Sequence, residues 1–177
     1  MEIKELPTYV TQLLEELDAP TRLRKHLQIV YSTAEEIVGA ICEKWPALPL
    51  NKQQVLIGAA THDIGKAEHP EELVESGSNH LETGYNLLLK QGYSKEMAQF
   101  ALTHEDWNKT ERSLEELLVS LSDLIWNGIR NDTLEELVIE KIAERLQAEY
   151  WDVFMEMDPI LMEIAKGADE RLSYQGS

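Results

Sequence analysis

Apolar residues recur at helical spacing along the whole of this 177-residue chain, and no run shows the strict alternation typical of a half-buried strand. Residue pairs with the spacing of a capping box open four of the expected helices: Asn51 with Gln54, Asn79 with Glu82, Ser113 with Glu116, and Thr133 with Glu136. The pattern predicts an all-α fold of about seven or eight helices joined by short loops.

Other signals set the boundaries of these helices. A long helix is expected to begin at Thr21, and the last helix is expected to begin at the pair Asp158-Pro159. The segments 66–78 and 105–113 are the longest without a helical pattern. No linker, repeat or shift in composition divides the chain, so we expect a single domain over residues 1–177.

The charge composition of the chain limits which binding partners are expected. Lys and Arg number 16 against 33 Asp and Glu, which gives a net charge of -17, so the average surface repels nucleic acid and anionic lipid. A membrane helix needs about 18 consecutive apolar residues, and no stretch of this sequence approaches that length. The lone Cys42 and the absence of a secretory signal in residues 1–20 predict a cytoplasmic protein. A phosphorylated substrate would need a local positive charge, supplied by metal ions or a few placed cations.

Four of the five histidines fall on apolar helical stripes, accompanied by two acidic residues: His26, His62, His80 and His104, with Asp63 and Asp123. One such histidine alone is more often a hydrogen-bonded core residue. Several together would bury unpaired polar groups at a cost of several kcal/mol unless a shared partner satisfies them. A divalent metal ion is such a partner, and imidazole with carboxylate suits Mn, Fe, Ni or Zn, whereas Mg leans more on oxygen.

Asp123 is the only ionisable residue in the apolar segment 117–125. On a continuous helix Asn127 and Arg130 would follow it on the same face, one and two turns later. This polar stripe is either a solvated helix face or the lining of a pocket in which Arg130 contacts an anion.

The six residues Thr61 to Lys66, with His26 upstream and Asp123 downstream, resemble the HD-domain metal-dependent phosphohydrolase superfamily, whose signature has the order His, His-Asp, Asp. The resemblance spans about residues 22–130 and leaves the expected helices of 131–177 outside it. It implies a compact HD-type helical domain. It also implies that the first metal ion is held by four ligands, namely His26, His62, Asp63 and Asp123.

His80 and His104 resemble the additional histidines of dinuclear HD branches, among them HD-GYP phosphodiesterases and symmetrical dinucleoside tetraphosphate hydrolases. By this resemblance Asp63 would bridge two ions, so that one or two divalent ions (Mn, Fe, Ni, Zn or Mg) bind per chain. After His104 the chain departs from the HD-GYP pattern, because the segment Glu105-Asp106-Trp107-Asn108 replaces the expected second histidine and the Gly-Tyr-Pro element.

The implied reaction is hydrolysis of a phosphate ester or anhydride, in a small nucleotide-like substrate, by metal-activated water. Lys66 follows the ligand pair closely enough to contact a phosphoryl oxygen, and with Asp63 it is the expected catalytic residue. Expected substrate contacts are Lys66, Arg130, Asn127 and Arg22; Arg22 belongs to a basic cluster that could equally be solvated surface. The alternative is a non-catalytic HD-type module that binds a nucleotide or a protein for regulation. The sequence leaves a homo-oligomer possible.

Overall fold

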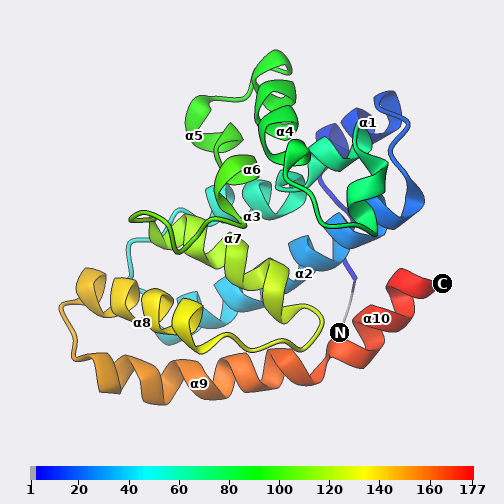
Figure 1. Ribbon diagram of the computed structural model, residues 1–177. Helices are drawn as coiled ribbons and strands as arrows, with labels where there is room; N and C mark the ends of the chain where they lie inside the picture. The colour runs from blue at the N-terminus through cyan, green and yellow to red at the C-terminus, as the bar shows by residue number, and fades with distance from the viewer. Residues whose placement is uncertain (1–2) are drawn as a thin grey trace.

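A computed structural model describes residues 3–177, and all regular secondary structure in this range is helical (Figure 1). Eight helices have nine or more residues: α1 (Thr8–Glu16), α2 (Thr21–Lys44), α3 (Lys52–Thr61), α4 (Asn79–Lys90), α7 (Leu114–Ile125), α8 (Asp132–Leu146), α9 (Tyr150–Lys166) and α10 (Ala168–Gly176). Four single-turn elements lie between them: the 3-10 helices η1 (Ile64–Ala67) and η2 (Pro70–Leu73), and the α-helices α5 (Lys95–Ala98) and α6 (Phe100–Thr103). The all-α prediction is confirmed.

One expected capping box, Ser113 with Glu116, is complete, and the expected box at Asn51 forms only its side-chain half, because the backbone N–H of Asn51 bonds to Glu115 instead of Gln54. The Asn51 side chain accepts the backbone N–H of Gln54 at 3.2 Å at the start of α3. The Ser113 hydroxyl accepts the backbone N–H of Glu116, whose carboxylate in turn accepts the N–H of Ser113 at 2.9 Å. These side chains satisfy amide donors that the first helical turn leaves without a partner.

The other two capping boxes are wrong, because tertiary or neighbouring groups take their place. The backbone N–H of Asn79 bonds to the carboxylate of Glu72 at 3.0 Å, so a loop side chain serves the start of α4. At α8 the cap is Asn131 instead of Thr133, and its side chain accepts the N–H of Leu134 at 3.0 Å.

The expectation that Pro159 begins the last helix is also wrong, since it lies inside α9. Buried Met157 and Leu161 continue the apolar stripe of α9 on both sides of the proline, and Pro159 itself faces outward. The ring removes a donor to the carbonyl of Met155, whose side chain is 68% exposed, so water can reach that carbonyl. Packing of the apolar face therefore carries the helix past the proline.

The long helix α2 runs through the middle of the molecule and joins two apolar cores (Figure 1). The larger core packs α2 against α3, α7 and α9, and α8 joins it through α7 and α9; Ile41 and Leu118 are among its fully buried residues. The smaller core gathers α1, the start of α2, η1 and α4 to α6 around residues such as Leu23 and Leu88. No helix among residues 3–177 is both long and apolar enough to cross a membrane. The histidines with inward-facing side chains lie where the two cores meet.

Candidate metal centre

Six ligand-type side chains converge from separate elements onto one place between the two cores. His26 comes from α2, His62 caps the C-terminal end of α3, Asp63 follows it, His80 lies in the first turn of α4, His104 follows α6, and Asp123 lies in α7. We call these six residues the His/Asp cluster. The structure brings all six of the expected ligand residues together.

The first half of the cluster consists of His26, His62 and Asp123, whose ligand atoms all lie within 4.8 Å of one another. The Asp123 carboxylate oxygen is 3.1 Å from Nε2 of His26 and 3.3 Å from Nε2 of His62. Oδ2 of Asp63 completes this group, at 3.3 Å from Nε2 of His26 and 3.7 Å from Nε2 of His62.

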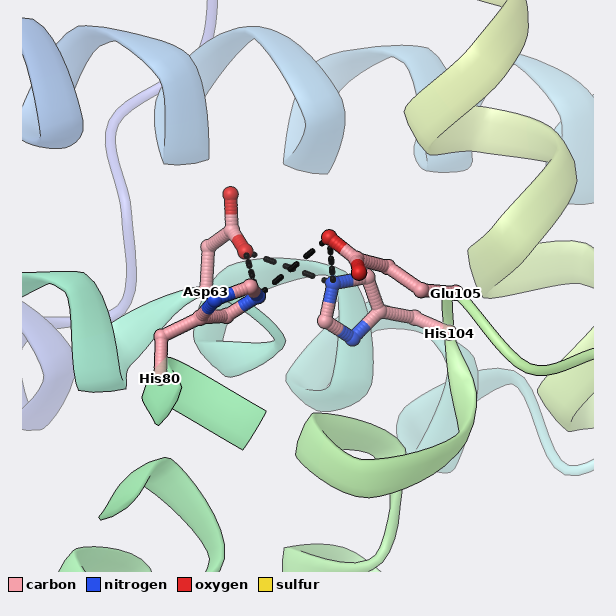
Figure 2. Close-up of side chains that lie close together, drawn as sticks. All are labelled: Asp63, His80, His104 and Glu105. Carbon is pink, nitrogen blue, oxygen red and sulfur yellow. Dashed lines mark ion pairs between the residues drawn. The ribbon is translucent and has the colours of Figure 1, made fainter. Parts of the chain in front are cut away.

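The second half contains Asp63, His80, His104 and Glu105 (Figure 2). Oδ1 of Asp63 lies 3.4 Å from Nε2 of His80 and 3.3 Å from Nε2 of His104. Oε1 of Glu105 is the last member of the group, at 3.3 Å from Nε2 of His80 and 3.8 Å from Nε2 of His104. Asp63 therefore turns one oxygen to each half, which is the arrangement of a bridging ligand.

Close backbone contact holds α4 against this place. A Cβ atom on Gly65 would lie 2.0 Å from the carbonyl oxygen of His80, and one on Gly84 would lie 3.2 Å from the nitrogen of Gly65. The first distance is impossible and the second is tight, so the glycines let η1 and α4 approach closely enough for His80 to face Asp63.

Hydrogen bonds at the outer ring nitrogens fix how three of the imidazoles point. Nδ1 of His62 donates to the carbonyl of Ala59 at 2.9 Å, and Nδ1 of His104 donates to the carbonyl of Phe100 at 3.2 Å. Nδ1 of His80 is bound to the carboxylate of Glu72. A proton held at Nδ1 leaves Nε2 as a bare lone pair, the tautomer that ligates a metal.

The inward atoms of the cluster are buried without hydrogen-bond partners, namely Nε2 of His62, His80 and His104 and Oδ1 of Asp63. Leaving such atoms unpaired costs roughly 1–3 kcal/mol each. One of these atoms lies in the first half of the cluster and three lie in the second half. All four are lone-pair donors, which divalent cations satisfy and another hydrogen-bond acceptor would not. The residues present thus fit the divalent ions that the sequence implies.

The electrostatics of the cluster favour a cation as well. Burial by itself would raise the pKa of Asp63 and Asp123, but His62 and the other imidazoles around them hold both values well below the usual range. Burial would lower the pKa of His26, yet the carboxylates of Asp123 and Asp63 raise it to about 9. Both carboxylates are therefore ionised at neutral pH, and a positive charge is stabilised at their centre.

A cavity of about 160 Å³ gives access to the cluster; we call it the inner cavity. Its lining includes His26 and Asp63, the cations Lys66 and Arg22, and the apolar side chain of Trp126. Nζ of Lys66 donates to Oδ2 of Asp63 at 2.7 Å. Two of the expected substrate contacts, Lys66 and Arg22, thus lie on its wall.

Arg130 does not lie on that wall, which corrects the expectation that it follows Asp123 on one helical face. Helix α7 ends at Ile125, and Gly128, with φ +87°, turns the chain before Arg130. The guanidinium is held by Glu135 and Asp158, each at 2.7 Å, and borders a different cavity. It is therefore committed to a local ion-pair network.

Asn127 is placed in the same turn after α7. Its side-chain oxygen accepts the backbone N–H of Ile129 at 3.2 Å, and it does not line the inner cavity. The turn explains why the polar stripe predicted from the sequence breaks after Asp123.

Two acidic residues of the site escaped the sequence reasoning. Glu72 is buried in η2 and holds both the ring and the backbone N–H of His80, but nothing in the sequence distinguishes it from the exposed Glu71 beside it. Glu105 carried a usable signal, because its carboxylate directly follows the ligand-type His104 in the sequence.

Comparisons with known proteins identify the family and the fold. The sequence profile of the HD domain matches residues 26–128, which is more than half of the chain. A solved structure of the HD domain of the phosphodiesterase PgpH from L. monocytogenes, in complex with cyclic-di-AMP, aligns with a TM-score of 0.55 at 16% sequence identity. The alignment covers 88% of this chain and 94% of that one. No curated protein sequence matches. The chain belongs to the HD-domain family.

Proposed function

We propose that this protein is a metal-dependent phosphohydrolase that cleaves a phosphate ester or anhydride in a small nucleotide-like substrate. The observation that carries the proposal is the double environment of Asp63, whose two oxygens face two separate groups of ligand atoms. Two-metal hydrolases of phosphate compounds place their ions about 3.5–4 Å apart, which requires a shared ligand of this kind. The structural neighbour binds a cyclic dinucleotide, which supports a nucleotide-like substrate here.

The ligands divide between the two halves of the cluster. His26, His62 and Asp123 would hold one ion, and His80, His104 and Glu105 would hold the other, with Asp63 shared. Divalent ions bound there supply Lewis acidity and lower the pKa of a water molecule toward neutrality. Four imidazoles among seven ligands favour Mn, Fe, Ni or Zn over Mg.

We assign Lys66 the role of stabilising the negative charge on the transferred phosphoryl group. Burial would lower its pKa, but the Asp63 carboxylate beside it raises the value, so the ammonium stays protonated. Its position on the wall of the inner cavity, next to the shared ligand, lets it stabilise a phosphoryl oxygen as negative charge develops.

Arg22 is the second cation that we assign to the substrate. Among residues 3–177 it is the one arginine that forms neither a hydrogen bond nor an ion pair, although carboxylates outnumber cations about twofold in this chain. An unpaired guanidinium on the rim of the inner cavity is suited to a phosphate group.

The test combines metal content with turnover. The purified protein is loaded separately with Mn, Fe, Co, Ni, Zn and Mg, its ions are counted by mass spectrometry, and phosphate release is measured. The substrates are nucleotides, dinucleoside polyphosphates, cyclic nucleotides and sugar phosphates. We expect turnover with at least one ion and one nucleotide, and its loss on chelation. Bound metal and bound nucleotide without any turnover would instead identify the non-catalytic module.

A further inference from the structure

Three imidazoles of the His/Asp cluster differ in the groups that hold their outer nitrogens. Nδ1 of His62 and Nδ1 of His104 each face a backbone carbonyl, which carries no net charge. Nδ1 of His80 instead faces the carboxylate of Glu72. A carboxylate behind an imidazole makes the opposite ring nitrogen more basic and therefore a stronger metal ligand. In residues 3–177 this feature occurs in the second half of the cluster and not in the first.

Glu72 carries a buried charge that no cationic side chain neutralises. Its side chain is 3% exposed, and its carboxylate accepts the backbone N–H of Asn79 at 3.0 Å and that of His80 at 3.1 Å. No lysine or arginine in the part of the chain that the structure describes forms an ion pair with it. An uncompensated buried carboxylate is costly. A divalent ion at Nε2 of His80 would compensate the charge of Glu72 across the ring.

The fold of the segment 66–78 places the Glu72 carboxylate against α4. Nε2 of His69 lies 3.0 Å from the hydroxyl oxygen of Thr83, which joins the start of η2 to α4. A Cβ atom on Gly77 would lie 2.3 Å from Oε1 of Glu72, so only a glycine leaves room for the carboxylate where it stands. The position of Glu72 is therefore set by the segment as a whole.

We propose that Glu72 is a positioning residue for the second metal ion and sets how tightly the second half of the cluster holds that ion. The inference rests on the two-ion arrangement of the proposed function but not on turnover. Glu105, which belongs to the second half alone, has a side chain that is 41% exposed, whereas Asp123 in the first half is 21% exposed. Solvent screens the charge of Glu105 more strongly, so the buried carboxylate of Glu72 supplies negative charge that this half otherwise lacks.

Titration of the metal-free protein with Mn(II) tests the inference by binding alone. Electron paramagnetic resonance of the free ion gives the number of ions bound per chain and their dissociation constants. Two Mn ions that share a ligand are magnetically coupled, so the same spectra show whether both ions are bound to one chain. We expect the wild-type protein to bind two ions.

Glu72→Gln removes the charge but keeps an oxygen that can accept from His80. We expect one of the two dissociation constants to rise by about 10–100-fold and the other to stay within about threefold of the wild-type value. Glu71→Gln is the matched control, because it removes the same charge from the exposed neighbour in η2. It should leave both constants unchanged.

Gly77→Ala reaches the same ion without changing any charge. The added methyl group would displace the Glu72 carboxylate, so we expect one constant to rise by about tenfold or more. Gly39→Ala is its control, because a Cβ atom there meets nothing within 4 Å. Melting temperatures show whether each variant is folded, and Gly77→Ala decides if Glu72→Gln does not fold.

A double variant shows whether the effect passes through the ring of His80. In a His80→Ala protein, the further change Glu72→Gln should not alter metal binding, because the imidazole that links Glu72 to the ion is absent. A role of Glu72 only in capping α4 predicts the same loss in both backgrounds, and that result would overturn the inference.

The remaining outcomes separate the inference from the proposed function. A folded Glu72→Gln protein that keeps both constants overturns the role of Glu72 and leaves the two-ion hydrolase standing, and so does an equal weakening of both ions. A wild-type protein that binds a single ion overturns the two-ion arrangement and this inference with it. Two ions, one of them weakened in the variants, without phosphate release from any compound would retain the role of Glu72 and exclude the hydrolase.

Discussion

Two groups of charged side chains in this protein, the ion pairs around Arg130 and the His/Asp cluster, differ in how their polar atoms are satisfied. At the junction of α7, α8 and α9, Nε and Nη2 of Arg130 donate to the carboxylates of Glu135 and Asp158 at 2.7 Å. In the His/Asp cluster the closest nitrogen–oxygen distances among the six side chains are 3.1 Å or more, and four buried atoms have no hydrogen-bond partner.

The difference distinguishes charges that hold the fold from charges that hold a ligand. In the Arg130 network the guanidinium is satisfied within the protein, so nothing further is needed there. In the cluster the outer nitrogens of three imidazoles are bonded to the protein while their inner nitrogens are left bare, namely those of His62, His80 and His104. An arrangement that satisfies one side of each ring and exposes the other to a common centre is typical of a metal site.

The largest effect is expected when the shared ligand is removed. In Asp63→Asn the carboxylate that faces both halves is lost, so we expect both ions to bind more weakly and turnover to fall by roughly a thousandfold or more. Metal content and phosphate release are measured on the same preparation. Asp158→Asn is the matched control in the Arg130 network, and it should keep its metal. If Asp63→Asn retained its full metal content, the bridging arrangement would be wrong.

A smaller effect is expected when only one half of the cluster is removed. The double variant His80→Ala with His104→Ala leaves His26, His62 and Asp123 in place, so the metal bound per chain should fall by half. Most turnover should be lost, because the second ion neutralises the phosphoryl oxygens in two-metal sites. Equal metal content in the wild-type and double-variant proteins would instead make these histidines contacts of the substrate.

Substitution of Lys66 tests whether this cation beside the cluster contributes to turnover or only stabilises the fold. Lys66→Ala should leave the metal content unchanged, since the ammonium is not a ligand. Turnover should fall by roughly ten- to a thousandfold, the range for one electrostatic contact to the transition state. A variant with the wild-type rate on the best substrate would exclude Lys66 from the mechanism, whereas Lys66→Arg should restore part of the rate by returning the charge.

The ligands that could be predicted from the sequence are those whose direction follows from local helical periodicity. His26, His62 and His104 lie on helical stripes whose period follows from backbone geometry alone, and the structure brings them together. Glu72 could not be identified in this way, because its role depends on a loop folding back onto α4, and no local pattern encodes that contact.

The errors in the fold arose where local rules compete with tertiary packing. Pro159 is a typical first residue of a helix, but the apolar face of α9 needs the helix to continue through it. Conversely, the stripe from Asp123 to Arg130 assumed a continuous helix, but α7 ends at Ile125 and the chain turns at Gly128. A single positive-φ glycine thus separates a residue of the metal cluster from a residue of an ion-pair network only seven positions later.

Arg130→Ala is expected to have the smallest effect, and it returns to the comparison of the two regions. The guanidinium is partly exposed, so solvent screens its two ion pairs and the free energy of unfolding should fall by only about 1–2 kcal/mol. Because Arg130 is occupied by Glu135 and Asp158, KM for the best substrate should stay within twofold of the wild-type value. Urea unfolding and steady-state kinetics measure the two quantities. A tenfold rise in KM at unchanged stability would reverse the assignment, and would mean that Arg130 leaves its carboxylate partners to bind the substrate.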